Sequence, residues 1–318
     1  MDNLTHSLVG AVLGQAGLKT KTGLAMPALI IGANLPDIDA ACFFWMEGTE
    51  HLGFRRGITH GPPAMVLLPL VLAGLLWGFD RWQAKRGKRP AGRLPVSFKW
   101  LFLLSFIGCL THPALDWMNV YGIRLLEPFS SQWFYGDALF IIDVWLWALL
   151  IGAWWWSARK EKRGGNWMRP ARIAIAMGLA YIGVNWLWTQ TVYAGANGPY
   201  TLGPYEKVIV SPTPISFWDR EVLFKRPGRV WEGGIYTPGS LAEVAPLSEA
   251  NCSLPDLVVE RRNDTQLDAF LFWSRAPFAE RFEDGSVILR DARFYDPRAR
   301  DRFSVALPDV ECEELPSR

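Results

Sequence analysis

The sequence has few histidines and cysteines, and it lacks charged residues altogether over several long stretches. Its 318 residues include four histidines and four cysteines, whereas half of the residues are apolar and seventeen are tryptophan. This composition is unusual for a water-soluble cytosolic enzyme. The length is sufficient for about two domains.

Four stretches contain no charged residue: Pro62–Phe79, Trp100–Thr111, Val144–Ala158 and Ile173–Asn197. A helix needs roughly 20 apolar residues to cross a bilayer core, so the outer two stretches qualify outright and the middle two qualify with one polar end. We therefore predict an integral membrane protein. No cleavable signal peptide is visible, because the first residues are not basic and Thr5-His6 interrupts the region that would be apolar.

Two basic segments predict the orientation of these spans. Arg81–Lys99 contains no acid, and Arg159–Arg172 contains only Glu161. Loops rich in Lys and Arg stay on the cytoplasmic side of a bacterial inner membrane. A nucleic-acid-binding patch is the alternative interpretation, but the position between apolar spans favours topology. We therefore expect a lipid bilayer and no nucleic acid as partner.

The orientation of the other segments follows from these two loops. Two weaker apolar stretches, Leu4–Leu18 and Leu24–Leu35, flank the small basic turn Lys19-Thr20-Lys21 and would form a hairpin that starts and ends outside. The predicted total is about six membrane segments. The predicted fold is thus mainly α, with a membrane-embedded helical domain over residues 1–194 that carries the metal site.

Residues 195–318 have a different sequence pattern, which predicts a small external β-rich domain. Short β-rich runs such as "KVIVS" and "DLVVE" alternate with turn signals, and "FEDGSVILR" predicts a hairpin with its turn at Asp284-Gly285. Cys252 and Cys312 are a candidate disulfide if this side is oxidising, and two unrelated thiols are the alternative.

The candidate site comes from histidines and aspartates that the predicted topology gathers at the external helix ends: His6, Asp37, Asp39, His60, His112, Asp116, Asp137 and Asp143. His112 and Asp116 are one helical turn apart and share a face, so they could bind one ion or support each other as ligand and outer partner. Ionisable groups near a bilayer are costly and usually mark function. Mixed His and Asp ligands suit Zn²⁺ or another borderline divalent ion.

Each element of this pattern also has a simpler interpretation. A single His-x-x-x-Asp is more often a polar pair at a helix end, and Pro-Asp-x-Asp is often an ordinary helix stop. Their convergence on one face favours a metal site. His51 is instead predicted to be a solvated residue of a flexible external loop. The tryptophans at the helix ends fit an interfacial belt without chemistry.

The motifs resemble the YdjM-like family of predicted membrane-bound metal-dependent hydrolases, which is itself similar to zinc-dependent phospholipase C and related single-strand nucleases. The resemblance is carried by "MDNLTHSLVGAVLG", "NLPDIDA", "RRGITHG" and "HPALDWMNVYGIRLLEPFSSQWFYGDALFIID", and more faintly by "FWSRAPFAERFEDGSVILRDARFY". It implies as metal ligands His6, Asp37, Asp39, His60, His112 and Asp116. It implies as polar neighbours Asn119, Asp137 and Asp143, beside which we place Asn34 and Thr59.

The chain departs from the family pattern at one position. The family commonly has His-Arg-Gly before Thr-His-Ser, whereas this chain has Arg55-Arg56-Gly57 before Thr59-His60-Gly61. A guanidinium cannot ligate a metal, but it can hold a phosphate or carboxylate. The number of ions, one or two, is therefore left open, with zinc expected and manganese or magnesium as alternatives.

The functional prediction is a metal-dependent hydrolase that cleaves a phosphoester of a lipid or lipid-linked substrate at the outer membrane face. Asp116 or Asp37 would act as base or ligand, and Arg56, Arg55 and Arg124 would clamp the phosphate. The alternative is a non-catalytic membrane protein that binds a metal or lipid headgroup structurally and recruits a partner. A transporter is a third hypothesis, although no paired broken halves are visible. The sequence predicts neither the substrate nor the oligomeric state.

Overall fold

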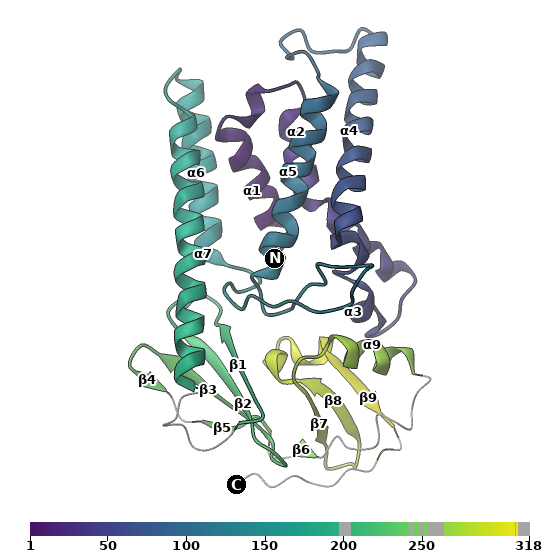
Figure 1. Ribbon diagram of the computed structural model, residues 1–318, viewed down its shortest axis with the longest axis vertical. Coiled ribbons are helices and arrows are strands. Elements are labelled where there is room, and N and C mark those ends of the chain that lie inside the picture. The colour runs from purple at the N-terminus through teal and green to yellow at the C-terminus, as the bar shows by residue number, and fades with distance from the viewer. Residues whose placement is uncertain (197–204, 242–243, 249–250, 253–263, 309, 311–318) are drawn as a thin grey trace. The chain divides into compact units, whose positions relative to one another are not determined.

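A computed structural model of the chain describes residues 1–196, 205–241, 244–248, 251–252, 264–308 and 310 (Figure 1). The chain forms two compact units. The first comprises Met1–Asp39 and Arg56–Trp186, and the second comprises Ala40–Arg55 and Leu187–Arg318. The sequence placed a domain boundary after residue 194, and it gave no sign that residues 40–55 belong with the second unit.

The first unit is helical. Its long helices are α1 (Asn3–Gln15), α2 (Ala25–Asn34), α4 (Pro62–Lys85), α5 (Phe98–Trp117), α6 (Val144–Lys162) and α7 (Met168–Ala196), the last of which continues into the second unit. Short 3-10 segments connect them: η1 (Leu18–Thr20), η2 (Leu35–Phe44) and η3 (Ile58–His60). Helix α2 packs against both α1 and α5, and α5 also packs against α4.

Four helical segments in the described part of the chain are long and apolar enough to cross a membrane: Ala25–Phe44, Pro62–Lys85, Phe98–Trp117 and Met168–Ala196. The predicted total of about six is therefore not confirmed. Helix α1 has only 13 residues, and the last turn of α6 carries a run of charged residues from Arg159 to Lys162. Helix α1 is therefore too short, and helix α6 too charged at its end, to count as a full membrane span.

Two glycines let α2 and α5 approach each other closely. A Cβ added to Gly32 would lie 2.7 Å from the carbonyl oxygen of Ser105, and one added to Gly108 would lie 2.6 Å from that of Leu29. Small residues at such crossings allow backbones to pack in direct contact inside a membrane. The crossing brings His112, one turn beyond Gly108, next to the last turn of α2.

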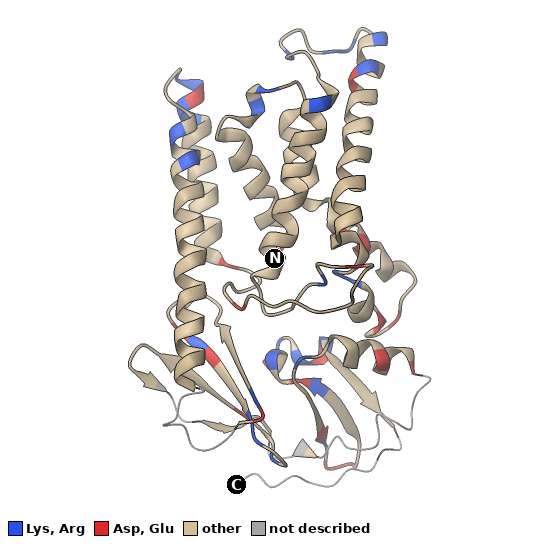
Figure 2. Ribbon diagram, in the orientation of Figure 1, with Lys and Arg blue, Asp and Glu red and all other residues tan. Residues whose placement is uncertain are grey.

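Charge is separated along the helical unit, as Figure 2 shows. Lys and Arg gather at one end of α4, α5, α6 and α7, and the acidic residues between the helices lie mainly towards the opposite end (Figure 2). Between these ends the outward faces are apolar, with exposed side chains on α4 such as Leu67 and Leu75 and on α7 such as Leu179 and Val184. An apolar belt between polar ends is typical of a membrane-spanning bundle.

The second unit contains two antiparallel sheets. One is formed by β1 (Lys207–Pro212), β2 (Arg220–Lys225), β3 (Trp231–Thr237), β4 (Ser240–Leu241) and β5 (Ala245–Pro246), in the order β1-β2-β3-β4 with β5 also paired to β3. The other has the order β6 (Asn251–Cys252), β7 (Pro277–Arg281), β8 (Val287–Asp291) and β9 (Ser304–Leu307). A core cluster that includes Ile209, Trp231 and Phe278 draws on both sheets.

The β-rich prediction is confirmed for the described residues. Strands β7 and β8 form the predicted hairpin, and Gly285 at its turn has φ of 85°. The run "DLVVE" and Cys312 lie outside the described residues. Cys252 is disulfide-bonded, whereas Cys42 and Cys109 are free thiols.

Two helices of the second unit were not predicted. Helix α9 (Thr265–Trp273) begins at Asp264, whose carboxylate accepts from the backbone N–H groups of Gln266 and Leu267. It packs against α3 (Glu50–Phe54), which carries His51. The expectation of a loop at His51 was therefore wrong, because residues 50–54 gain a helical partner that is distant in sequence.

Candidate metal centre

Helix α5 supplies the two residues around which the candidate metal centre is built. His112 and Asp116 are four residues apart on one face of the helix, and both side chains are buried. The Nε2 atom of His112 lies 3.6 Å from Oδ2 of Asp116. The predicted pairing across one helical turn is therefore present in the structure.

Helix α1 brings His6 to the same position. The helix begins at Asp2, whose side chain accepts from the backbone N–H groups of Leu4 and Thr5. The His6 ring stacks on that of His112 with centroids 3.8 Å apart. Its Nε2 atom lies 3.4 Å from Oδ1 of Asp116. The α-ammonium of Met1 also donates to this oxygen, so positive charge is already accommodated there.

Segments η2 and η3 complete the cluster. Nε2 of His60, at the end of η3, lies 3.8 Å from Oδ2 of Asp116, and Oδ1 of Asp37, in η2, lies 3.7 Å from Nε2 of His112. Two groups of three ligand atoms result, each with all its atoms within 4.8 Å of one another: His6, His112 and Asp116, and Asp37, His60 and His112. His112 belongs to both groups.

Hydrogen bonds outside the cluster select the tautomer of two imidazoles. Nδ1 of His112 lies 2.7 Å from the carbonyl oxygen of Ala33 and must donate to it. The hydroxyl of Thr59 donates to Oδ2 of Asp39 and therefore accepts from Nδ1 of His60. In both rings Nε2 keeps its lone pair and faces the cluster. Metal-ligating histidines are held in this way by carbonyls and carboxylates.

The inward-facing atoms lack hydrogen bonds. Among the described residues, Nε2 of His6, His60 and His112 are buried without a hydrogen-bond partner, whereas Oδ2 of Asp116 forms an ion pair with Arg56. Buried polar atoms are nearly always satisfied, and leaving one unsatisfied costs about 1–3 kcal/mol. Burial, together with the neighbouring His112, lowers the pKa of His60 well below its ordinary value and keeps the ring neutral.

The spacing of these atoms fits a divalent cation. Ligand atoms about 2.0–2.2 Å from a tetrahedrally coordinated ion lie about 3.3–3.6 Å from one another. The distances of 3.4 Å and 3.6 Å from Asp116 oxygens to His6 and His112 fall in this range, and that of 3.8 Å to His60 lies just above it. The residues present therefore fit the predicted ion. Asp39 lies outside both groups and supports His60 through Thr59.

Arg56 connects the acids of the cluster. It has a positive φ of 54°, which costs energy for a residue with a side chain. Its backbone N–H donates to Oδ2 of Asp39 at 2.8 Å. Its Nε lies 3.0 Å from Oδ2 of Asp116, and Nη1 donates to Oδ1 of Asn119 at 3.1 Å and to the carbonyl of Gly122. The Arg56 guanidinium, which the sequence predicted to clamp a phosphate, therefore already contacts acceptors within the protein.

The predicted polar neighbours Asn34, Asp137 and Asp143 lie outside the two metal triads. Asn34 donates to Ser7 and to the carbonyl of Ile30. Asp143 accepts from the first turn of α6 and from the Tyr181 hydroxyl. Asp137 is buried, with a positive φ of 48°.

The two remaining arginines do not join the metal groups. Arg124 is held by Glu127 at 2.8 Å. Arg55 belongs to the second unit, where it lies over the ring of Phe43.

The sequence missed two partners of the cluster, the carbonyls of Ala33 and Gly122. A backbone carbonyl has no residue-type signature, so no sequence signal could have identified them. It also missed the Tyr121 ring, over which the Arg56 guanidinium lies at 4.5 Å. The aromatic residue two positions after Asn119 was visible in the sequence, but its contact depends on the turn after α5.

Comparisons with known proteins match the chain to a family and to a curated relative. The family described as YdjM inner membrane protein matches residues 1–192, which include every predicted site residue. The protein YfhP of Bacillus subtilis (strain 168), described as uncharacterized, is 26% identical over 141 residues. The match covers 42% of this chain and 39% of YfhP, so the chain spans about two fifths of that relative. No solved structure matches the chain.

Proposed function

Because this chain belongs to the YdjM inner membrane protein family, we propose that it is a membrane-bound, metal-dependent hydrolase that cleaves a phosphoester of a lipid or lipid-linked molecule. The observation that carries the proposal is the convergence of three buried, unpartnered imidazole Nε2 atoms on Asp116. A purely structural cluster would satisfy these atoms within the protein.

The proposed ion is divalent, with zinc favoured by the mixed nitrogen and oxygen ligands. His6, His60, His112, Asp37 and Asp116 would hold it. When bound, such an ion supplies a water of pKa near ~7 and stabilises charge that develops on phosphorus. The two triads share His112, so they describe either one ion or two ions close together.

The chain's own residues have separate tasks in this proposal. Arg56 orients Asp116 through Nε and holds Asp39 through its backbone, so we assign it to positioning rather than to clamping substrate. Asp37 is less buried than Asp116 and is the better candidate to accept a proton from an incoming water. Asp39 and Thr59 keep the proton of His60 on Nδ1.

An apolar cavity on the helices that carry His6, His112 and Asp116 supports a lipid substrate, although none of these three residues lines it. It has a volume of about 300 Å³ and is lined by side chains of α1, α5, α6 and α7. Its α5 residues include Thr111 and Leu115, each adjacent in sequence to a ligand of the first triad, and its α1 residues include Val9, one turn from His6. The Thr111 hydroxyl is bonded to the Gly108 carbonyl, which leaves an apolar surface suited to a hydrocarbon chain.

The orientation in the membrane is part of the proposal. The cationic helix ends of the helical unit (Figure 2) would face the cytoplasm, as Lys- and Arg-rich loops generally do. The candidate metal centre, with His6 near the start of α1 and Asp116 near the end of α5, would then lie near the external surface. The β-rich unit would also be external.

The proposal is tested on the full chain purified in detergent or nanodiscs. Metal content is measured by mass spectrometry, and release of headgroup or phosphate is assayed against phospholipids and isoprenoid phosphates. We expect stoichiometric metal in the wild type, and loss of metal and turnover in His112→Ala and Asp116→Ala. His51→Ala is the matched control, because His51 belongs to neither triad.

Two outcomes would contradict the proposal. A wild-type preparation without stoichiometric metal would remove the metal centre, and undiminished turnover in Asp116→Ala would remove its catalytic role. Metal that is retained with no turnover on any substrate, together with lower thermal stability of Asp116→Asn, would favour the alternative of a structural site.

A further inference from the structure

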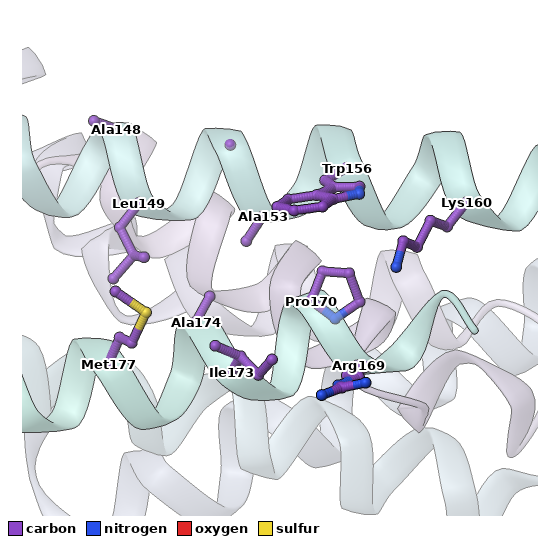
Figure 3. A pocket seen from close by; sticks show the side chains of 11 residues that line it. Ala148, Leu149, Ala153, Trp156, Lys160, Arg169, Pro170, Ile173, Ala174 and Met177 are labelled. Carbon is purple, nitrogen blue, oxygen red and sulfur yellow. The ribbon is translucent and has the colours of Figure 1, made fainter. Parts of the chain in front are cut away.

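A second apolar groove lies between α6 and α7, away from the candidate metal centre (Figure 3). It has a volume of about 470 Å³, and none of its lining residues belongs to either metal triad. Leu149 and Met177 lie at one end, and Lys160 and Arg169 lie at the other (Figure 3). The groove is therefore apolar along its length and cationic at a single end.

Among the described residues, no acidic side chain lines the cationic end. The lining contains no Asp or Glu. The acid of the same helical turn, Glu161, pairs instead with Lys19. Lys160 is half-buried, with Nζ 5.4 Å from the centre of the Trp156 ring, and Arg169 is exposed. Two cations beside a tryptophan at helix ends are typical of the headgroup level of a membrane.

The length of the groove matches one leaflet. Its α6 residues run from Ala148 to Lys160, a rise of about 18 Å at ~1.5 Å per residue. Half of a bilayer core of about 30 Å is ~15 Å. An acyl chain that starts at the cationic end would therefore end near Ala148, close to the bilayer midplane.

We propose that this groove binds one anionic phospholipid from the leaflet at the basic ends of the helices. Lys160 and Arg169 contact its phosphate and headgroup, and an acyl chain lies along Ala153, Ile173 and Met177. Basic pockets between transmembrane helices recognise anionic headgroups in this way. A zwitterionic lipid would leave the two positive charges uncompensated, so the groove discriminates by net charge. This inference is independent of the proposed function.

The test is native mass spectrometry of the full chain released from nanodiscs that contain equal amounts of phosphatidylglycerol and phosphatidylcholine. We expect one phosphatidylglycerol to be retained, and about tenfold less retention in Lys160→Gln/Arg169→Gln. The matched control is Arg159→Gln/Lys162→Gln, which removes the same charge from the same end of the unit but outside the groove lining.

A second pair of variants tests the apolar part. A Cβ added at Gly152, which lines the groove, meets no atom within 4 Å, so Gly152→Leu adds apolar bulk at the groove without a clash at Cβ. Gly183 on α7 is equally open but outside the lining, which makes Gly183→Leu the control. We expect Gly152→Leu to reduce phosphatidylglycerol retention and Gly183→Leu to leave it unchanged.

Three results would overturn the inference. The first is equal retention of the two lipids by the wild type. The second is an equal loss in the two charge variants, which would indicate a general surface attraction. The third is displacement of the lipid by millimolar glycerol 3-phosphate, which would indicate a soluble phosphate ligand. The thermal unfolding midpoint of the full chain serves as the folding control, and it is expected to be the same in all four variants.

Discussion

Both units of the molecule bury an aspartate beside an arginine, but they complete the surroundings differently. In the β-rich unit, Asp291 accepts from Arg293 through Nε and Nη2, from the Ser274 hydroxyl, and from the backbone N–H groups of residues 275, 276 and 293. In the helical unit, Asp116 accepts from the Met1 α-ammonium and pairs with Arg56, and beside it lie three imidazoles whose Nε2 atoms have no hydrogen-bond partner.

We interpret the difference as that between a structural ion pair and the proposed metal site. A buried charge with a complete set of donors has no need of a ligand, whereas buried imidazole nitrogens without a hydrogen-bond partner leave an unmet cost that a bound cation would remove. We therefore expect variants of the first cluster to change stability, and variants of the second to change metal binding.

The largest effect is expected for Asp291→Ala. The substitution leaves Arg293 buried, with 0% of its side chain exposed and without its carboxylate, and such a loss costs about 3–5 kcal/mol. Denaturant unfolding of the purified full chain measures it, with metal content as a second readout that is expected to stay unchanged. Unchanged stability would show that the saturated cluster is not structural.

The next effect is a pH dependence of stability that arises from Glu221 in the β-rich unit. Burial, with Asp296 nearby, raises the pKa of Glu221 from 4.5 to about 7. The folded state therefore binds this proton more tightly than the unfolded chain. The resulting penalty is absent below pH 4.5, grows as the pH rises towards 7, and is constant above it, at about 3 kcal/mol or less.

Glu221→Gln removes this titration. We expect the variant to be more stable than the wild type at pH 8 and of similar stability at pH 4, as measured by denaturant unfolding. The exposed Glu206→Gln is the control and should change stability little at either pH. A gain at pH 4 equal to that at pH 8 would contradict the assigned cause.

A smaller effect is expected for Thr59→Val in the helical unit. The substitution keeps the approximate size of the side chain but removes the hydroxyl between Asp39 and Nδ1 of His60. Loss of such an outer partner typically weakens metal affinity 10–100-fold. Competition with a chelator of known affinity measures it, and Thr20→Val, far from the triads, is the control. Equal affinities for the two variants would count against His60 as a ligand.

The smallest effect is expected for His51→Ala. This imidazole is partly exposed, and its Nδ1 lies 2.8 Å from the Gly48 carbonyl. Surface substitutions usually change stability by about 0.5 kcal/mol or less. We expect no loss of metal, in contrast to His112→Ala. A loss of metal in both would mean that burial and unsatisfied lone pairs do not distinguish ligands in this protein.

The division into a helical part and a β-rich part was predictable from residue types alone. Runs without charge, basic segments between them, and the alternation of turn signals with β-rich runs predicted a helical membrane part followed by a β-rich part. The four-residue spacing of His112 and Asp116 predicted a shared helical face. Short helices were harder, since α9 and α3 are stabilised by each other across more than two hundred residues of sequence.

The sequence by itself therefore predicted which residues could bind a metal and that they lie in or next to apolar helical segments, because hydropathy and helical periodicity act locally along the chain. Only the tertiary structure decided which of these residues face one another. It placed Asp39 behind His60, engaged Arg56 with protein acceptors, and oriented His112 through the Ala33 carbonyl. Those roles depend on backbone atoms and helix crossings, which carry no signature in residue type.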